Sequence, residues 1–229
     1  MDAVDHHNAP AWLAPYGKIR AESWLLLASL LGQPSEGTGE LLRNLTWDDA
    51  IPEHLDHALR DLRRAGRDFT PSAMEVEFSR LFIAPGRSTM MPYASWYRER
   101  KIQARTLAVL RSDLIRLGIA KQEGNPEPED HAGALCEIMS LLSQAPGGVP
   151  YEEQARFFRR HIAPWMNNLF RDLQAAKHAE FYRAVGSFGA RLLEAESEYL
   201  KYAAAAPCTK PEGGLHDENG NSLQPADIH

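Results

Sequence analysis

Cysteine is scarce in this chain of 229 residues, and its two cysteines, Cys136 and Cys208, form no CxxC or other metal-ligand pattern. Such sparse usage is typical of a reducing compartment and argues against a disulfide framework. The longest apolar run, residues 24–31, is far shorter than the roughly 18 to 20 residues that span a bilayer. The acidic, polar N-terminus lacks the basic start and apolar stretch of a secretory signal. The sequence therefore predicts a cytoplasmic protein without stable membrane insertion.

Residues that favour β-sheet are also few. Valine, isoleucine and threonine together contribute 20 residues, whereas alanine and leucine contribute 58. This balance favours helices over strands, so we predict an all-α fold. The chain is long enough to bury one well-packed core.

Positive charge is in deficit, with a formal net charge of -6 at pH 7. A chain with this charge offers no general basic face to a phosphate backbone, so nucleic-acid binding is not expected. A cationic partner fits the charge better.

Motifs of catalysis and metal binding are missing as well. Nine histidines are scattered without HExxH or HxxxH spacing, and there is no Gly-rich phosphate loop. His131 could pair with Asp130 or Glu127 for acid–base chemistry, yet no nucleophile is spaced to complete a triad. Cys136 lies about 140° round a helix from His131. We therefore predict no catalytic residues, no metal site and no cofactor.

Apolar periodicity and the positions of glycine and proline divide the chain into helices. The pattern predicts a helix over 17–31, which buries Ile19, Trp24, Leu27, Leu30 and Leu31. Residues 40–66 are expected to form short helices, one of which begins at Pro52, buries Leu55, Leu59 and Leu62, and is closed by Gly66. Further helices are predicted over 70–84, over 96–117 with Gly118 as its cap, within 127–142, over 151–176 with an interruption at Pro164, and over 178–204. A polar connection at 119–128 is the predicted hinge, which would permit either a monomer or a domain-swapped dimer. Residues 1–206 are thus expected to form one helical-bundle domain. The Gly- and Pro-rich residues 207–229 are expected to form a flexible tail.

An acidic cluster runs directly into an amphipathic helix where residues 127–142 read EPEDHAGALCEIMSLL. The apolar stripe at i, i+3, i+4, i+7 spacing consists of Leu135, Ile138, Met139 and Leu142. Glu127, Glu129 and Asp130 lie where the helix dipole favours negative charge, and Asp130 is the expected N-cap. The cluster therefore stabilises its own helix. Its place beside His131, at the open end of an apolar face, also indicates recognition of a cationic group with an apolar neighbour.

A loop that follows a helix is the second candidate surface, within residues 77–97, EFSRLFIAPGRSTMMPYASWY. Met90, Met91 and Tyr93 are expected to be partly exposed, since adaptable methionines and amphipathic rings suit a surface for apolar peptides. In residues 157–173, FFRRHIAPWMNNLFRDL, the aromatic side chains of Phe157, Phe158, Trp165 and Phe170 are expected to be core, and Arg159 and Arg160 are expected to face solvent. His161 within them is expected to be a hydrogen-bonded structural histidine.

Taken together, these segments resemble the TorD/DmsD/NarJ family of cytoplasmic redox-enzyme maturation chaperones. The resemblance covers about residues 17–204. It rests on the order of RAESWLLLASLLGQP, EFSRLFIAPG, PYAS, EPEDH, HIAPW and FYRAVGSFGARLLEAE. It implies an all-helical protein that binds an apo-molybdoenzyme catalytic subunit, often at its twin-arginine signal peptide, until cofactor loading is complete.

Two groups of residues match motifs of this family. The central motif is matched by Pro128, Asp130 and His131. The loop implicated in peptide binding is matched by Leu81, Pro92, Tyr93 and Ser95.

A twin-arginine peptide presents two guanidinium groups and then an apolar stretch, so it needs carboxylates beside an apolar groove. We hypothesise that Glu127, Glu129 and Asp130 attract the arginines. His131 would orient one carboxylate or contact the peptide, and Tyr93 would receive the apolar stretch.

Two other functions stay open at the level of sequence. The first is a NarJ-like assembly chaperone for a molybdoenzyme subunit that is not exported. The second is a small nucleotide-hydrolysing enzyme, since nucleotide binding has been proposed for the family. The sequence does not identify the client.

Overall fold

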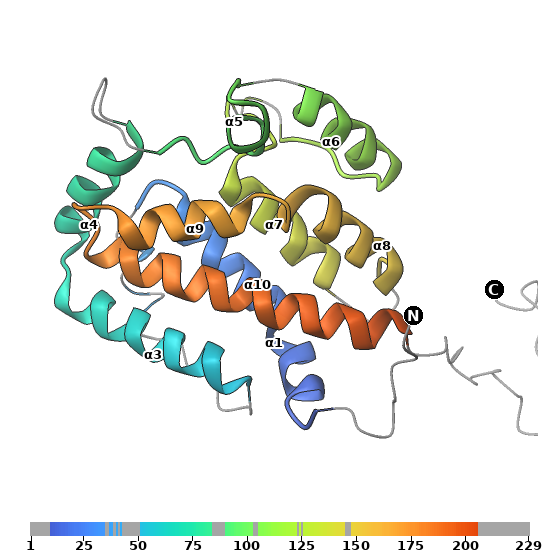
Figure 1. The fold of residues 1–229 in the computed structure, drawn as a ribbon, viewed down its shortest axis with the longest axis horizontal. Coiled ribbons are helices and arrows are strands. Elements are labelled where there is room, and N and C mark those ends of the chain that lie inside the picture. The colour runs from blue at the N-terminus through green and yellow to red at the C-terminus, as the bar shows by residue number, and fades with distance from the viewer. Residues whose placement is uncertain are drawn as a thin grey trace, which may run out of the picture.

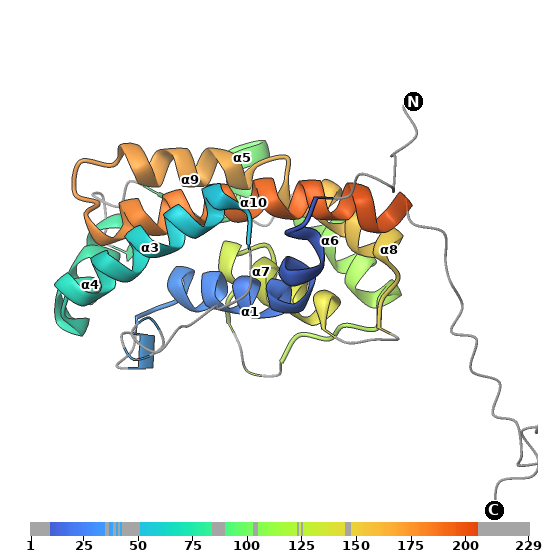
Figure 2. The ribbon, with the colours of Figure 1, turned by 90° about the horizontal axis from the view of Figure 1, so that it is seen from below.

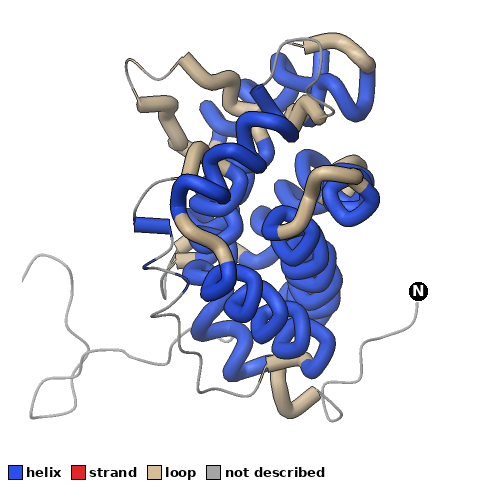
Figure 3. Tube along the Cα trace, turned by 90° about the vertical axis from the view of Figure 1, so that its left-hand side faces the viewer, coloured by secondary structure: helices blue, strands red, loops and turns tan. Residues whose placement is uncertain are grey.

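The computed structural model describes residues 10–34, 37–38, 40, 42, 51–83, 90–102, 105–122, 124, 126–144 and 148–205. Over these residues the chain consists of helices and their connections, with no named strand (Figure 3). Extended backbone pairs only in one antiparallel bridge within this part of the chain, between Tyr93 and His131. The predicted all-α fold is confirmed.

The helices form two layers, which Figures 1 and 2 show from perpendicular directions. One layer consists of α10 (Phe181–Ala205) between α9 (Met166–Ala175) and α3 (Glu53–Asp68). The other consists of α1 (Leu13–Leu31) packed on α7 (Ala132–Ser143). Helix α1 also contacts α10, so the core lies between the layers.

Shorter elements extend the layers at their edges (Figure 1). After α3 come α4 (Pro71–Phe78) and the π-helical turn η2 (Ser79–Ile83). Then follow α5 (Ala94–Glu99) and α6 (Arg105–Arg116). Helix α8 (Tyr151–Phe157) and the π-helical turn η3 (Phe158–Ile162) pack beside α10 and α7 and lead into α9.

Two glycines of α10 allow α9 to approach closely. A Cβ atom at Gly189 would lie 2.4 Å from the ring of Phe170, and one at Gly186 would lie 2.9 Å from the Phe170 carbonyl oxygen. Both distances are too short for real contacts. Glycine is therefore required at these positions by helix packing.

The predicted core positions of the first helix, Ile19, Trp24, Leu27, Leu30 and Leu31, are all buried. The helix itself begins at Leu13, four residues before the predicted start.

Helix α3 buries its predicted stripe of Leu55, Leu59 and Leu62 but continues to Asp68. The prediction that Gly66 closes this helix is wrong. Gly66 lies within the helix and is buried. A Cβ atom at this position would lie 2.9 Å from the side chain of Leu42, so the close contact with Leu42 requires glycine.

The predicted single helix over 96–117 is wrong, because the structure has α5 and α6 separated by a turn. Arg100 adopts a left-handed φ of 54° and ends α5. The carboxylate of Glu99 accepts hydrogen bonds from the backbone N–H of Thr106, at 2.7 Å, and from its hydroxyl. A side chain from one helix thus caps the start of the next. Gly118, with a φ of 69°, follows α6 as predicted.

The predicted interruption at Pro164 is confirmed, since a turn separates η3 from α9 there. Helix α10 begins at Phe181 rather than 178. The buried carboxylate of Glu77 accepts hydrogen bonds from the backbone N–H groups of Glu180, Phe181 and Tyr182 at 2.8–3.1 Å. A residue about one hundred positions earlier therefore caps this helix.

The expected tail, residues 207–229, lies outside the described residues. The hinge predicted at 119–128 connects α6 to α7, and all of it except residues 123 and 125 is described. In the part of the chain that the structure describes, no helix is long and apolar enough to cross a membrane.

Candidate functional site

A groove of about 550 Å³ opens between α1, α7, η2 and the connection from α6 to α7. Its apolar lining includes Leu31, Phe82, Met91, Ile119, Ile138 and Leu141. Its charged lining comprises Glu127, Glu129, Glu137 and Lys121, with His131 beside them. Three carboxylates against one lysine make the groove acidic while its wall stays apolar.

Tyr93 and Glu127 form a hydrogen-bonded pair in the groove. The Tyr93 hydroxyl donates to Oε1 of Glu127 at 2.6 Å, and its ring meets the ring of His131 edge-on at 5.3 Å. Burial and the adjacent Glu127 carboxylate raise the pKa of Tyr93 far above its ordinary value. Tyr93 therefore keeps its proton and holds the Glu127 carboxylate in place.

His131, rather than Asp130, is the N-cap of α7, so the expectation for Asp130 is wrong. Nδ1 of His131 accepts a hydrogen bond from the backbone N–H of Gly133 at 3.1 Å. Burial lowers the pKa of His131, although the nearby carboxylates of Glu127 and Asp130 oppose this shift. A neutral imidazole is the form that can accept the capping bond at Nδ1.

Asp130 is fully buried and joins two segments that are far apart in sequence. Its Oδ2 accepts a hydrogen bond from the backbone N–H of Ser95, and its backbone oxygen accepts one from Ala94, both at 2.9 Å. The backbone N–H of Ala132 donates to the Pro92 carbonyl at 2.8 Å. These bonds place Tyr93 beside His131.

Glu129 forms a two-point ion pair with Arg111 of α6. Nε of Arg111 lies 3.0 Å from Oε1 of Glu129, and an Nη atom lies 2.9 Å from Oε2. The hydrogen bonds from Arg111 hold the pKa of Glu129 below its ordinary value. The Arg111 side chain is 53% exposed and that of Glu129 is 13% exposed.

The structure brings together five of the nine predicted peptide-binding residues along the groove: Pro92, Tyr93, Glu127, Glu129 and His131. The other four do not line it. Leu81, Ser95 and Asp130 are buried and Pro128 is half-buried. The Leu81 carbonyl accepts a hydrogen bond from the backbone N–H of Met90 at 3.2 Å, so Leu81 anchors the start of the 90–95 segment.

Of the two methionines expected to be partly exposed, Met91 is half-buried and lines the groove. For Met90 the expectation is wrong, because it is only 3% exposed and belongs to the core.

Sequence reasoning missed the face that α7 turns to the groove. That face consists of Ala134, Glu137, Ile138 and Leu141, of which only Ile138 belongs to the predicted stripe. Their spacing of i, i+3, i+4, i+7 repeats the helical period, so a second stripe was visible in the sequence. The stripe holds a carboxylate and an exposed leucine, and it therefore did not stand out as a core pattern.

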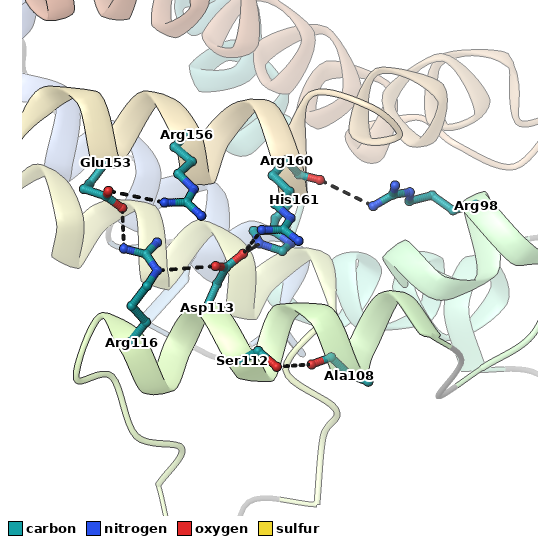
Figure 4. Close-up of polar contacts among 9 residues, drawn as sticks. All are labelled: Arg98, Ala108, Ser112, Asp113, Arg116, Glu153, Arg156, Arg160 and His161. Atoms are coloured by element: carbon teal, nitrogen blue, oxygen red, sulfur yellow. Dashed lines mark hydrogen bonds and ion pairs between the residues drawn. The ribbon is translucent and has the colours of Figure 1, made fainter.

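A second polar cluster anchors α6 to η3 and α8 (Figure 4). Oδ2 of Asp113 lies 2.7 Å from Nε2 of His161 and 3.1 Å from an Nη atom of Arg160. Arg116 pairs with Glu153 at 2.6 Å. Although burial opposes it, the hydrogen bond from His161 and the charge of Arg160 lower the pKa of Asp113. The prediction that His161 is a hydrogen-bonded structural histidine is confirmed.

Among the described residues, no group of three or more His, Cys, Asp and Glu side chains is placed to hold a metal ion. What the site offers is a set of carboxylates beside an apolar wall, which suits binding of a cationic and apolar segment.

The chain is an all-helical protein with an acidic groove that has an apolar wall, and comparison with known proteins gives its family. Residues 48–171 match the family model described as nitrate reductase delta subunit. The chain belongs to this family, which is the TorD/DmsD/NarJ family of maturation chaperones.

Curated relatives carry names of the same family. The Tat proofreading chaperone DmsD of Haemophilus influenzae is 27% identical over 120 residues, which cover 52% of this chain and 57% of the relative. The chaperone TorD of Actinobacillus pleuropneumoniae is 25% identical over 93 residues, covering 41% and 46%. TorD of Colwellia psychrerythraea is 18% identical over 201 residues, covering 76% and 84%. The chain thus spans about half the length of the first two relatives.

A solved structure shares the fold. It is a redox enzyme maturation protein from Archaeoglobus fulgidus, with a TM-score of 0.53 and 17% identity. The match covers 77% of this chain and 94% of that one.

Proposed function

We propose that this protein is a cytoplasmic chaperone for the catalytic subunit of a molybdopterin-dependent oxidoreductase. It binds the twin-arginine signal peptide of this client, its apo form, or both, assists cofactor insertion and prevents premature export. The observation that carries the proposal is the groove, in which Glu127, Glu129 and Glu137 border an apolar wall. The names of the relatives, DmsD and TorD, support it.

The groove matches the two parts of such a peptide. A guanidinium group is bound best by a carboxylate that accepts from both sides of its planar fork. Glu127 is held by Tyr93 and Glu129 by Arg111, so both carboxylates already have defined positions. An apolar stretch that forms a helix needs a hydrophobic groove.

Exposed apolar side chains mark where that stretch would lie. Ile83 of η2 is 55% exposed and Leu141 of α7 is 54% exposed, and both line the groove. Apolar side chains left open to this extent gain from burial by a partner. The peptide would therefore run from the carboxylates towards η2 and the later turns of α7.

Asp130 takes an indirect role in this proposal. Because it is fully buried, its carboxylate does not reach an arginine of the peptide. It positions Tyr93 and His131 by accepting the N–H of Ser95. Leu81 and Ser95 support the same segment from behind.

Titration calorimetry with a client signal peptide tests the proposal. Glu127→Gln and Glu137→Gln should each weaken binding, and a peptide with two lysines in place of the arginines should bind less tightly. Glu152→Gln is the matched control, because Glu152 is an exposed residue of α8 outside the groove. Equal affinities for the wild type and both groove variants would show that the peptide binds elsewhere.

The family description favours a second candidate, a NarJ-like chaperone for a subunit that is not exported. In that case the groove would take an N-terminal segment or a surface of the folded client. The two candidates differ in whether the oxidoreductase encoded next to this gene begins with a twin-arginine signal. Copurification from the native host would identify the client itself.

A further inference from the structure

One carboxylate of the groove already holds a guanidinium group, and that group comes from this chain. Arg111 reaches from α6 to Glu129 and occupies both of its carboxylate oxygens, at 3.0 and 2.9 Å. This is the two-point geometry that a free arginine side chain would adopt on a carboxylate.

We propose that Arg111 is a built-in competitor, which fills the site of one client arginine and is displaced when the peptide binds. The inference rests on the proposed function and deepens it, because it assigns Glu129 to one arginine of the peptide and gives that site a resident occupant.

Occupancy by Arg111 excludes a second two-point contact on Glu129. A carboxylate has about four lone-pair sites, and Arg111 already uses one on each oxygen, which is the pair that a single arginine fork reaches together. The Glu129 side chain is only 13% exposed, so little of it can be reached while Arg111 is in place. A peptide arginine must therefore exchange with Arg111, and the exchange leaves the charge on Glu129 balanced.

Arg111 can leave at low cost. Its side chain is 53% exposed, and ion pairs of such exposed groups contribute little to folding. Once released, the guanidinium would be hydrated by water. Among the described residues, Glu129 is its only hydrogen-bonding partner.

Helix α6 can stay in place when Arg111 moves. Asp113 lies about 200° round the helix from Arg111, on the face that meets His161 and Arg160 (Figure 4). Arg116 adds its pair with Glu153. The exchange therefore needs only a change of side-chain rotamer at Arg111.

The exchange would also select for arginine. A lysine is a point charge that cannot reproduce the two-point contact, so it competes poorly with Arg111. Lys121, which lines the same groove, is a further positive charge that a weak cationic ligand would have to overcome. A peptide arginine meets the same repulsion from Lys121 but recovers the two-point contact on Glu129.

Calorimetric titration of four proteins with one twin-arginine peptide tests the inference: the wild type, Arg111→Gln, Glu129→Gln and the double variant. Arg111→Gln should tighten binding by up to about fivefold, the upper end of the range expected when an exposed competing pair is removed. Glu129→Gln should weaken it. In the double variant the gain should vanish, because the carboxylate for which the two guanidinium groups compete is gone.

Arg105→Gln is the matched control. It removes the same charge from an exposed position on the same helix, outside the groove lining. A general electrostatic effect would tighten binding equally in Arg105→Gln and Arg111→Gln, and that result would overturn the inference. Arg111→Lys keeps the charge but loses the fork, so it should give a smaller gain than Arg111→Gln.

The outcomes separate this inference from the proposed function. If the wild type binds the peptide and Arg111→Gln shows no gain, Arg111 is not a competitor and the proposed function stands. If the wild type does not bind the peptide at all, the inference and the peptide-binding part of the proposed function are both wrong, and binding of the apo client is then measured separately. Thermal unfolding of each variant shows whether a change in affinity comes from a change in fold.

Discussion

Two ion pairs of arginine and glutamate in this protein have the same chemistry but differ in their access to water. Arg20 and Glu196 join α1 to α10, with side chains that are 2% and 0% exposed. Arg111 and Glu129 join α6 to the groove, with side chains that are 53% and 13% exposed. Access to water therefore separates a pair that holds the fold together from one that can exchange its partner.

The buried pair has partners on nearly every side. An Nη atom of Arg20 donates to Gln154, and the hydroxyl of Tyr16 donates to Glu196, both at 3.0 Å. The Arg20 guanidinium also lies over the ring of Tyr199, 4.2 Å from its centroid. Such a network resists exchange because any replacement would have to satisfy the same desolvated groups.

The largest effect is expected at this buried pair. Arg20→Ala should lower the free energy of unfolding by about 3 to 5 kcal/mol, because it leaves the charge of Glu196 buried and unpaired. Urea denaturation measures it. Replacing both partners at once, as Arg20→Met with Glu196→Leu, should recover much of the loss. A loss below about 1 kcal/mol in Arg20→Ala would remove the distinction between the two pairs.

The second largest effect on stability is expected at Asp130, the buried carboxylate that holds the segment of Tyr93 beside His131. Asp130→Ala should cost about 1 to 3 kcal/mol, because the N–H of Ser95 loses its acceptor in a buried place. It should also weaken peptide binding, since Tyr93 and His131 lose their fixed positions. Asp130→Asn, which keeps an acceptor, is the milder control. Unfolding and titration calorimetry of both variants test this, and a loss of affinity without a loss of stability would argue for direct contact instead.

Acidification should lower the free energy of unfolding, because His131 at the start of α7 takes up a proton. Burial lowers the pKa of His131 in the folded state, so the unfolded chain takes up the proton first. The contribution of His131 is therefore complete above its ordinary pKa of 6.5 and is lost as the pH falls through the lowered folded value. Protonation of Nδ1 would also remove the cap on Gly133, a loss of about 1 kcal/mol.

Denaturation at several pH values between 7.5 and 5 checks this prediction. His131→Asn keeps an acceptor for the cap but does not titrate, so its stability should fall less on acidification. His161, whose pKa is also lowered by burial, accounts for part of the remaining slope. Identical pH profiles of the wild type and His131→Asn would contradict the prediction.

The smallest effect is expected at the exposed pair. Arg111→Ala should change the free energy of unfolding by less than about 1 kcal/mol, because both groups can be hydrated when the pair is broken. The small effect should shrink further in high salt, which screens exposed charges. Urea denaturation of the variant at low and high salt measures both. A loss as large as that of Arg20→Ala would mean that Arg111 is structural.

Local patterns in the sequence predicted most helices and part of the groove. The stripes of α1 and α3 follow the helical period, and these stripes are buried as expected. The carboxylates at 127 and 129 and His131 were selected from their place at the start of α7, and they do line the groove. Each of these features depends on residues within a few turns of one another.

Errors arose where a distant side chain determines a helix end. Glu77 caps α10 from across the fold, and Asp130 serves the start of α5 rather than its own helix. Neither contact has a signal in the local sequence, because the partner lies on another element. The break after Glu99 has a local cause, since Arg100 adopts a left-handed conformation. The apolar stripe nevertheless continues on both sides of the break, and for this reason the pattern predicted one helix.

The sequence by itself determined an all-helical chain of this family with an acidic segment that runs into an apolar helix face, since composition, periodicity and motif order are properties of neighbouring residues. Only the tertiary structure decided which carboxylates face the groove, which one is buried behind it, and which guanidinium group pairs with Glu129. The reason is physical: burial and ion pairing depend on how separate helices meet, and packing decides this over the whole chain.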